Sequence, residues 1–129
     1  MANTVTTTSI VDGESVGTMH VYLKSDGGTG DITDEVLLDS SALAGAKSIK
    51  KILRVSGALI GFSATLRFKE TADIGVLSLP ADECFDFNLQ ETGTINNPEG
   101  TGSTGDLVAT TAGFSTATDT GTIIIKYKK

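Results

Sequence analysis

Apolar and polar residues alternate with a period of two along most of this sequence, and this pattern constrains the fold more than any other feature. Segment 62–69 (FSATLRFK) is the clearest case, because every second residue is apolar and the residues between are polar. Successive side chains of a β-strand point to opposite faces, so such a segment has one buried face and one solvated face. No long stretch shows the helical period of about 3.6 residues. The chain is therefore predicted to be all-β.

Eight further segments carry the same signal. They are 19–24, 85–90 and 123–128, the weaker candidates 32–38, 48–56, 75–79 and 106–111, and the threonine-rich run 4–11. Turn-forming residues separate them, including the glycine-rich run 25–31 and Gly57. Short strands in such regular succession predict a sandwich or a barrel. One helical turn fits at 40–45, where Ser40 would cap the turn and Gly45 would end it.

The length of 129 residues fits one domain, so residues 1–129 are expected to share a single hydrophobic core. Residues 1–11 are predicted to form an N-terminal arm or an edge strand. Residues 91–105 contain four glycines and one proline and are predicted to form a long loop. That loop is expected to be either mobile or ordered by a partner.

The charge balance argues against a nucleic-acid partner. Sixteen acidic and ten basic residues give a net charge of −6, opposite in sign to what phosphate binding requires. No run approaches the ~18 apolar residues of a membrane span, so no membrane partner is expected. The basic C-terminus, Lys126 to Lys129, has two readings that both remain open: it solvates the chain end, or it contacts an acidic partner.

Catalytic and metal-binding constellations are missing from the sequence. The chain holds one histidine, His20, and one cysteine, Cys84, which is too few for a catalytic triad or a zinc site. Cys84 is expected to be a small buried or half-buried residue rather than a reactive thiol. We therefore predict no enzymatic activity, no cofactor and no small-molecule substrate.

An acidic loop leaves one metal question open. Asp26, Asp31, Asp34 and Glu35 lie in or directly after the glycine-rich run, and Ca²⁺ prefers several such oxygen ligands. The spacing matches neither an EF-hand nor the glycine-rich calcium repeat of β-rolls. A solvated loop is the favoured interpretation, and a calcium site is the alternative.

Two parts of the chain resemble a group of small tailed-bacteriophage virion proteins. The opening segment, Met1 to Gly13 (MANTVTTTSIVDG), is similar to their threonine-rich first strand and its Asp-Gly turn. In the second half, the similarity follows Phe85-Asp86-Phe87, Asn96-Asn97, a glycine-rich stretch ending at Leu107, and a final apolar strand. The resemblance covers residues 1–13 and roughly 85–129, while the middle of the chain departs from the group.

Members of that group include head decoration (cement) proteins, which are β-sandwich subunits on the outside of the capsid, commonly trimeric. The resemblance implies a single-domain antiparallel β-sandwich, jelly-roll-like, with about eight to nine strands. It also implies the major capsid protein as partner, a homotrimer, and a location on the capsid exterior. Two alternatives remain: a tail- or fibre-associated virion subunit, and a displayed host- or glycan-binding module. The absence of tryptophan and the 5% aromatic content disfavour a sugar-binding module.

Interface residues are predicted where the chain is polar and extended, glycine-rich, or basic at its end. They are Thr4, Val5, Thr6, Thr7, Thr8, Asn96, Asn97, Pro98, Lys128 and Lys129.

Overall fold

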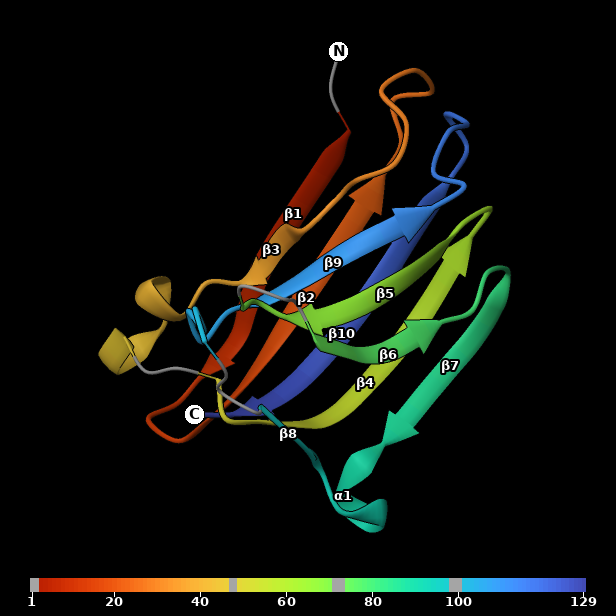
Figure 1. Cartoon of the computed structure of the whole chain (residues 1–129). Coiled ribbons are helices and arrows are strands. Elements are labelled where there is room, and N and C mark those ends of the chain that lie inside the picture. The colour runs from red at the N-terminus through yellow and green to blue at the C-terminus, as the bar shows by residue number, and fades with distance from the viewer. Residues whose placement is uncertain (1–2, 47–48, 71–73, 98–100) are drawn as a thin grey trace.

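The computed structural model describes residues 3–46, 49–70, 74–97 and 101–129, and these form two antiparallel sheets packed face to face (Figure 1). The larger sheet has the order β1-β2-β10-β4-β7, with the short β8 paired to β4, and the smaller sheet has the order β3-β9-β5-β6. The strands are β1 (Thr4–Asp12), β2 (Val16–Lys24), β3 (Glu35–Leu38), β4 (Lys51–Ile60), β5 (Ser63–Phe68), β6 (Ile74–Leu79), β7 (Glu83–Asn88), β8 (Ile95–Asn96), β9 (Leu107–Ala112) and β10 (Thr120–Lys128). The predicted β-sandwich is confirmed.

Eight of the strands pair in the nested order of a jelly roll. If β1 and the two-residue β8 are set aside, the first strand pairs with the last, β2 with β10, and the second with the second-last, β3 with β9. The inner pairs, β4 with β7 and β5 with β6, complete the nest. A hairpin of strands wound in this way gives the two sheets of a jelly roll. Each of the nine predicted segments overlaps a strand, although residues 89–90 of the segment 85–90 belong to a helical turn and residue 48 lies outside the described residues, and β8 is the one described strand that was not predicted.

The core fills the space between the sheets with the inward side chains of both. Phe62 and Phe114 pack with their ring centroids 4.4 Å apart and their planes tilted by 56°. Val21 and Ile125 from the larger sheet and Leu66 from the smaller are fully buried. Each such side chain contributes about 1.5–3 kcal/mol through its removal from water. The alternating apolar residues of the sequence therefore supply the main stabilisation.

Gly57 does not end a strand, as the sequence suggested, but lies within β4. Its φ of +148° is one that residues with a side chain rarely adopt. A β-carbon at this position would overlap the carbonyl oxygen of Thr122 in the neighbouring β10. Glycine is needed here because the two backbones approach closely.

The predicted helical turn at 40–45 appears as two short 3₁₀ turns, η1 (Ser40–Ala42) and η2 (Ala44–Ala46). The cap is Asp39 rather than Ser40, because its side chain accepts a hydrogen bond from the Ser41 amide at 3.0 Å. Gly45 lies inside the second turn with a φ of 77° rather than ending the first. One unpredicted helical turn, α1 (Leu89–Thr92), follows β7.

The described part of the 91–105 segment is held by the chain itself. Its residues Ile95 and Asn96 form β8 against β4. The Asn97 amide donates to the Lys50 carbonyl at 2.8 Å, and the Gly105 carbonyl accepts from the Ile49 amide at 3.0 Å. The described residues of the segment are thus tied to β4 and to residues 49–50, and the choice between a mobile loop and one ordered by a partner stays a prediction.

Candidate functional site

Strand β1 forms one edge of the larger sheet, paired with β2 on one side and with no described strand on the other (Figure 1). The nine residues of Thr4–Asp12 are all exposed except Val5, which is half-buried. Thr7 and Ser9 lie on the same side of the sheet as buried Val21, yet both are exposed. Beyond Val5, the smaller sheet therefore does not cover β1, and the stretch from Thr6 to Ser9 is open at both faces and at one edge.

This edge carries little of the protection that exposed strands usually have. Natural edge strands avoid pairing with other chains through lysine, proline or β-bulges. The sequence of β1 contains neither lysine nor proline, and its bulge falls between Ser9 and Val11, near the end of the strand. Ile10 and Val11, 56% and 53% exposed, add apolar surface there. The regular stretch from Thr4 to Ser9 is open to a strand from another chain.

A second surface is the outer face of the larger sheet, where cations gather at one end. The register places Lys126 of β10 beside Arg54 of β4, and Lys128 beside Lys51. Alternation along β10 turns these lysines outward, because Ile125 and Tyr127 between them are buried. We call Lys51, Arg54, Lys126 and Lys128 the basic end.

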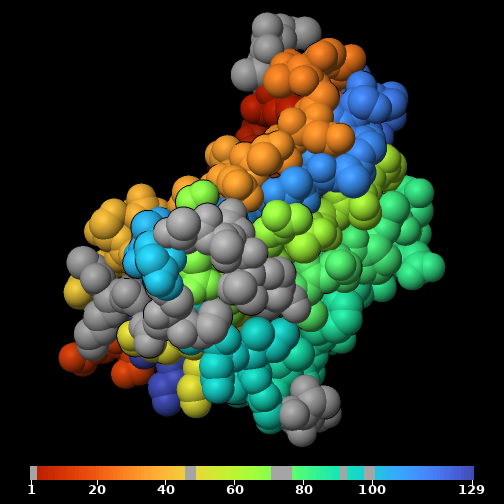
Figure 2. Space-filling view, in the orientation of Figure 1, coloured from red at the N-terminus to blue at the C-terminus, as the bar shows by residue number. Residues whose placement is uncertain are grey.

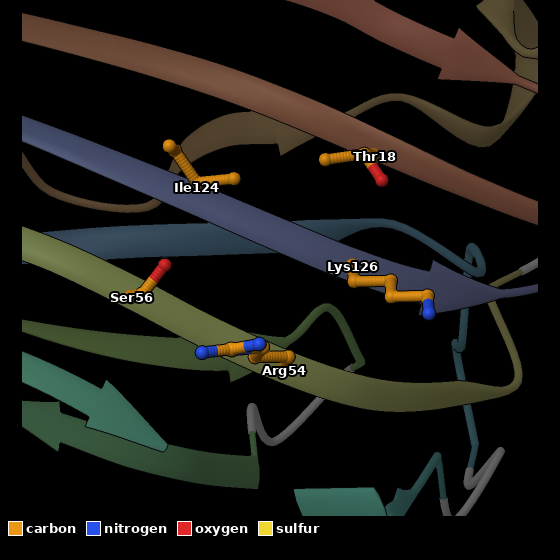
Figure 3. A pocket seen from close by; sticks show the side chains of 5 residues that line it. All are labelled: Thr18, Arg54, Ser56, Ile124 and Lys126. Atoms are coloured by element: carbon orange, nitrogen blue, oxygen red, sulfur yellow. The ribbon is translucent and has the colours of Figure 1, made fainter. Parts of the chain in front are cut away.

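Two residues of the basic end, Arg54 and Lys126, line a shallow depression of about 200 Å³ (Figure 3). Its lining comes from three adjacent strands: Thr18, Arg54, Ser56, Ile124 and Lys126. Arg54 is bidentate to Asp86 of β7, with Nε at 2.9 Å from Oδ1 and Nη2 at 2.5 Å from Oδ2. This hydrogen-bonded guanidinium lowers the pKa of Asp86 below its ordinary value. A depression this small and open suits contact with a macromolecule better than enclosure of a small molecule.

Charge is segregated between this outer face and the rest of the chain. Outward positions on the strands of the larger sheet hold five of the ten basic residues, Lys24 together with the basic end. Among the described residues at those positions, Asp86 is the one carboxylate. The face therefore has a net charge of +4, and the other five cations and fifteen carboxylates leave −10 for the remainder of the chain. The overall charge of −6 conceals a basic surface.

The predicted interface residues fall into different surroundings. Thr4, Thr6, Thr7 and Thr8 are exposed on β1, and Val5 packs partly against the core. Asn96 and Lys128 are exposed. Asn97 is buried, and its Nδ2 donates to the Ile49 carbonyl at 3.0 Å, which takes it out of the candidate interface. Pro98 lies outside the described residues.

Lys129 also faces the chain itself rather than a partner. Its side chain is fully buried, and Nζ donates to the carbonyls of Gly13 at 2.8 Å and Ala44 at 3.1 Å. The same Nζ forms an ion pair with the Asp12 carboxylate. This contact ties the C-terminus to the β1–β2 turn, so the predicted interface role is corrected for Lys129.

The acidic loop uses its carboxylates locally. Asp26 accepts hydrogen bonds from the Gly28 and Thr29 amides at 2.8 and 2.7 Å, and also from the Thr29 hydroxyl. Asp31 accepts from the Phe114 amide at 2.8 Å. No group of three or more His, Cys, Asp or Glu side chains able to hold a metal ion occurs among the described residues. The described geometry therefore favours the solvated-loop interpretation.

Cys84 and His20 both lie on the outer face of the larger sheet, in separate rows. Cys84 is exposed, which corrects the expectation that it would be buried, because it occupies an outward position opposite Ala58 on the edge strand β7. The hollow beside it is lined by Ala58, Leu59, Ile60, Asp82, Glu83 and Cys84, and this lining holds no histidine or cation that would favour the thiolate. His20 lies between Thr8 and Ile124. This arrangement provides no nucleophile–base pair.

Within the described ranges, no helix has the length and apolar character needed to cross a membrane. Comparisons of the chain with protein-family models, with curated proteins and with solved structures found no match. The function must therefore be argued from the two surfaces themselves.

Proposed function

We propose that this chain is a non-enzymatic structural protein of a tailed-phage virion, a decoration protein that binds the outer surface of the head and stabilises it. Its partners in this proposal are the major capsid protein and two further copies of itself. The resemblance of residues 1–13 and 85–129 to small virion proteins motivates the assignment. The jelly-roll sandwich is compatible with it, although the same fold serves many functions.

The open edge of β1 is the observation that carries the proposal. A nine-residue edge strand in which every residue but Val5 is exposed is costly for a free protein, because it invites pairing with other chains. A subunit that adds to a shell needs such a surface, since main-chain hydrogen bonds to a neighbouring strand give affinity without special chemistry. The two surfaces described above bind by shape and charge, and neither positions reacting groups.

Location within the particle is the first test. Purified virions of the phage that encodes the chain would be studied by cryo-electron microscopy and by immunogold labelling with an antibody against the chain. Density and label on the outside of the head are expected. Label on tails alone would contradict the decoration role and favour a tail- or fibre-associated subunit.

The role of β1 is tested by lysines placed along its edge. Deleting residues 1–11 would also remove Val5 from the core, so Thr6→Lys/Thr8→Lys is the sharper variant. Lysines on an edge oppose strand addition, and occupancy on particles stripped of the protein is expected to fall about tenfold or more. Thr65→Lys/Ser63→Lys adds the same charges to the solvent side of β5 and serves as the control. Unchanged occupancy of the β1 variant would contradict the edge assignment.

A further inference from the structure

We propose that the basic end of the larger sheet binds an acidic rim of a second copy of this chain. The rim consists of Asp31, Asp34, Glu35 and Asp39, at and beside β3, the edge strand of the smaller sheet. This inference rests on the proposed assembly role and names one contact within it, distinct from the β1 edge. It pairs two different patches of the chain, one on each copy.

The sign of the charges excludes a two-fold contact in which the basic end meets itself. In a two-fold dimer the same patch meets itself, so Lys51, Arg54, Lys126 and Lys128 would face the same four cations. Like charges brought together in this way cost affinity. The basic end must therefore meet a different, acidic surface. A contact between two different patches closes into a ring when the rotation permits, and a trimer is one such ring.

The β3 rim is the acidic surface that fits best. Glu35 and Asp39 are exposed, and Val36 between them is 42% exposed, so the rim combines charge with an apolar contact as the basic end does with Ile124. In Figure 2 the orange segment, which includes β3, runs along one margin of the visible face. The rim belongs to the smaller sheet and the basic end to the larger, so both can be occupied in one subunit.

Asp31 and Asp39 of the rim are held in place by neutral hydrogen-bond donors, so their positions are fixed while their charge remains. Asp31 accepts from the Phe114 amide at 2.8 Å, and Asp39 accepts from the Ser41 amide at 3.0 Å and the Ser41 hydroxyl at 2.6 Å. Asp34 accepts from the Thr110 hydroxyl at 3.3 Å, and its other oxygen is 3.9 Å from Lys69 Nζ. Side chains ordered before binding lose less entropy when they bind.

Nucleic acid fits the basic end less well than a protein does. The depression includes the apolar Ile124, and Arg54 is already bidentate to Asp86. The remainder of the chain carries a charge of −10, which repels a long polyanion beyond the patch. An acidic rim with an apolar residue beside it instead offers Ile124 an apolar partner as well as opposite charge.

Sedimentation velocity of the full chain over a range of concentrations tests the contact. Association is expected to weaken about tenfold between about 50 mM and about 500 mM salt, because salt screens exposed charges. Lys126→Glu is expected to weaken it about fivefold to tenfold at low salt. Arg67→Glu changes the net charge equally on the smaller sheet and should not weaken it. A chain that stays monomeric at all concentrations, or an assembly indifferent to Lys126→Glu, would overturn the proposal.

Charge exchange then tests the rim. Glu35→Lys alone is expected to weaken association, and Lys126→Glu/Glu35→Lys should restore part of it, because the opposite signs are again paired between copies. Failure of the double variant to recover would overturn the rim assignment. Tight binding of a duplex DNA oligonucleotide by wild type, lost in Lys126→Glu, would instead favour nucleic acid. Occupancy of phage heads is a separate readout. A chain that stays monomeric but still decorates heads refutes this contact alone. A salt-sensitive oligomer that is absent from heads refutes the decoration role alone.

Discussion

Replacing Tyr127 by phenylalanine is predicted to stabilise this protein, which is the reverse of the usual effect at a buried tyrosine. The Tyr127 side chain is fully buried in the core, and its hydroxyl has no hydrogen-bond partner among the described residues. The ring lies against Gly17 of β2, where a β-carbon would come within 2.5 Å of Tyr127 Cζ. The hydroxyl therefore loses its hydration on folding without gaining a bond in return.

The expected gain follows from two opposing contributions. Burying a hydroxyl without a partner costs about 1–3 kcal/mol, and Tyr127→Phe removes that cost. The small void left beside Gly17 forfeits some dispersion contacts, about 0.5 kcal/mol. The net increase in the free energy of unfolding is therefore about 1 kcal/mol or somewhat more. For a domain of this size, that corresponds to a rise in Tm of about 3–5 °C.

Urea denaturation followed by circular dichroism measures this change, with an expected rise of the midpoint by roughly 0.5 M. Tyr22→Phe, at a half-buried outward position on the same strand as Gly17, is the control and should change stability by less than about 0.5 kcal/mol. Burial, and secondarily the charge of Asp12, raises the pKa of Tyr127. The preference of the folded state for the protonated hydroxyl therefore contributes to the free energy of unfolding below the unfolded pKa, and this contribution is lost as pH rises through the folded pKa. The advantage of Tyr127→Phe should therefore grow at alkaline pH. A loss of more than about 0.5 kcal/mol at neutral pH would refute the reasoning, because it would show that the hydroxyl is satisfied.

Three further predictions address packing, acid stability and metal binding. Gly17→Ala is expected to cost about 1–3 kcal/mol in calorimetry, because its methyl group would enter the space of the Tyr127 ring; a cost below about 0.5 kcal/mol would mean that the ring moves freely. Hydrogen bonds from the Thr29 hydroxyl, the Thr29 amide and the Gly28 amide lower the pKa of Asp26 from 3.8 to about 2. The ionised Asp26 carboxylate therefore contributes to stability above pH 3.8, and this contribution is lost as pH falls through about 2. In urea titrations at those pH values, Asp26→Asn should lose less stability on acidification than wild type does. Calcium chloride or EDTA should shift Tm by less than about 1 °C, whereas a saturable rise with calcium would show that the acidic loop holds the ion.

The strands could be predicted from the sequence because each strand repeats its own burial pattern locally. In 62–69 the alternation alone separates buried Leu66 from half-buried Arg67. Gly57 misled the prediction because glycine usually marks a turn, whereas here it permits close contact with Thr122 of a strand more than sixty residues away. No local pattern contains that contact. The jelly-roll pairing of β2 with β10 is likewise a long-range property that alternation does not encode.

The two C-terminal lysines show how much a single step in register matters. Lys128 and Lys129 look equivalent in the sequence and were assigned the same interface role. The alternation that buries Ile125 and Tyr127 places Lys129 on that same inward side, where it binds the Gly13 and Ala44 carbonyls, and turns Lys128 outward. Extending the period-two pattern by one residue would have separated them, because a shift of one residue moves a side chain to the opposite face.

The basic end could not be predicted in the same way, because its residues come from strands that are neighbours only in the folded sheet. Alternation turns Arg54 and Lys126 outward, but only the pairing of β4 with β10 brings them side by side, with Lys51 and Lys128 one step further along. Net charge averages over all faces, and at −6 it argued against nucleic acid as a partner. In this sandwich the outer face of the larger sheet carries +4 and the remainder of the chain −10. The basic end and the acidic rim are therefore two surfaces of opposite charge on one chain. For a chain that assembles, the distribution of charge between the faces of its sheets therefore constrains the partner more than the total does.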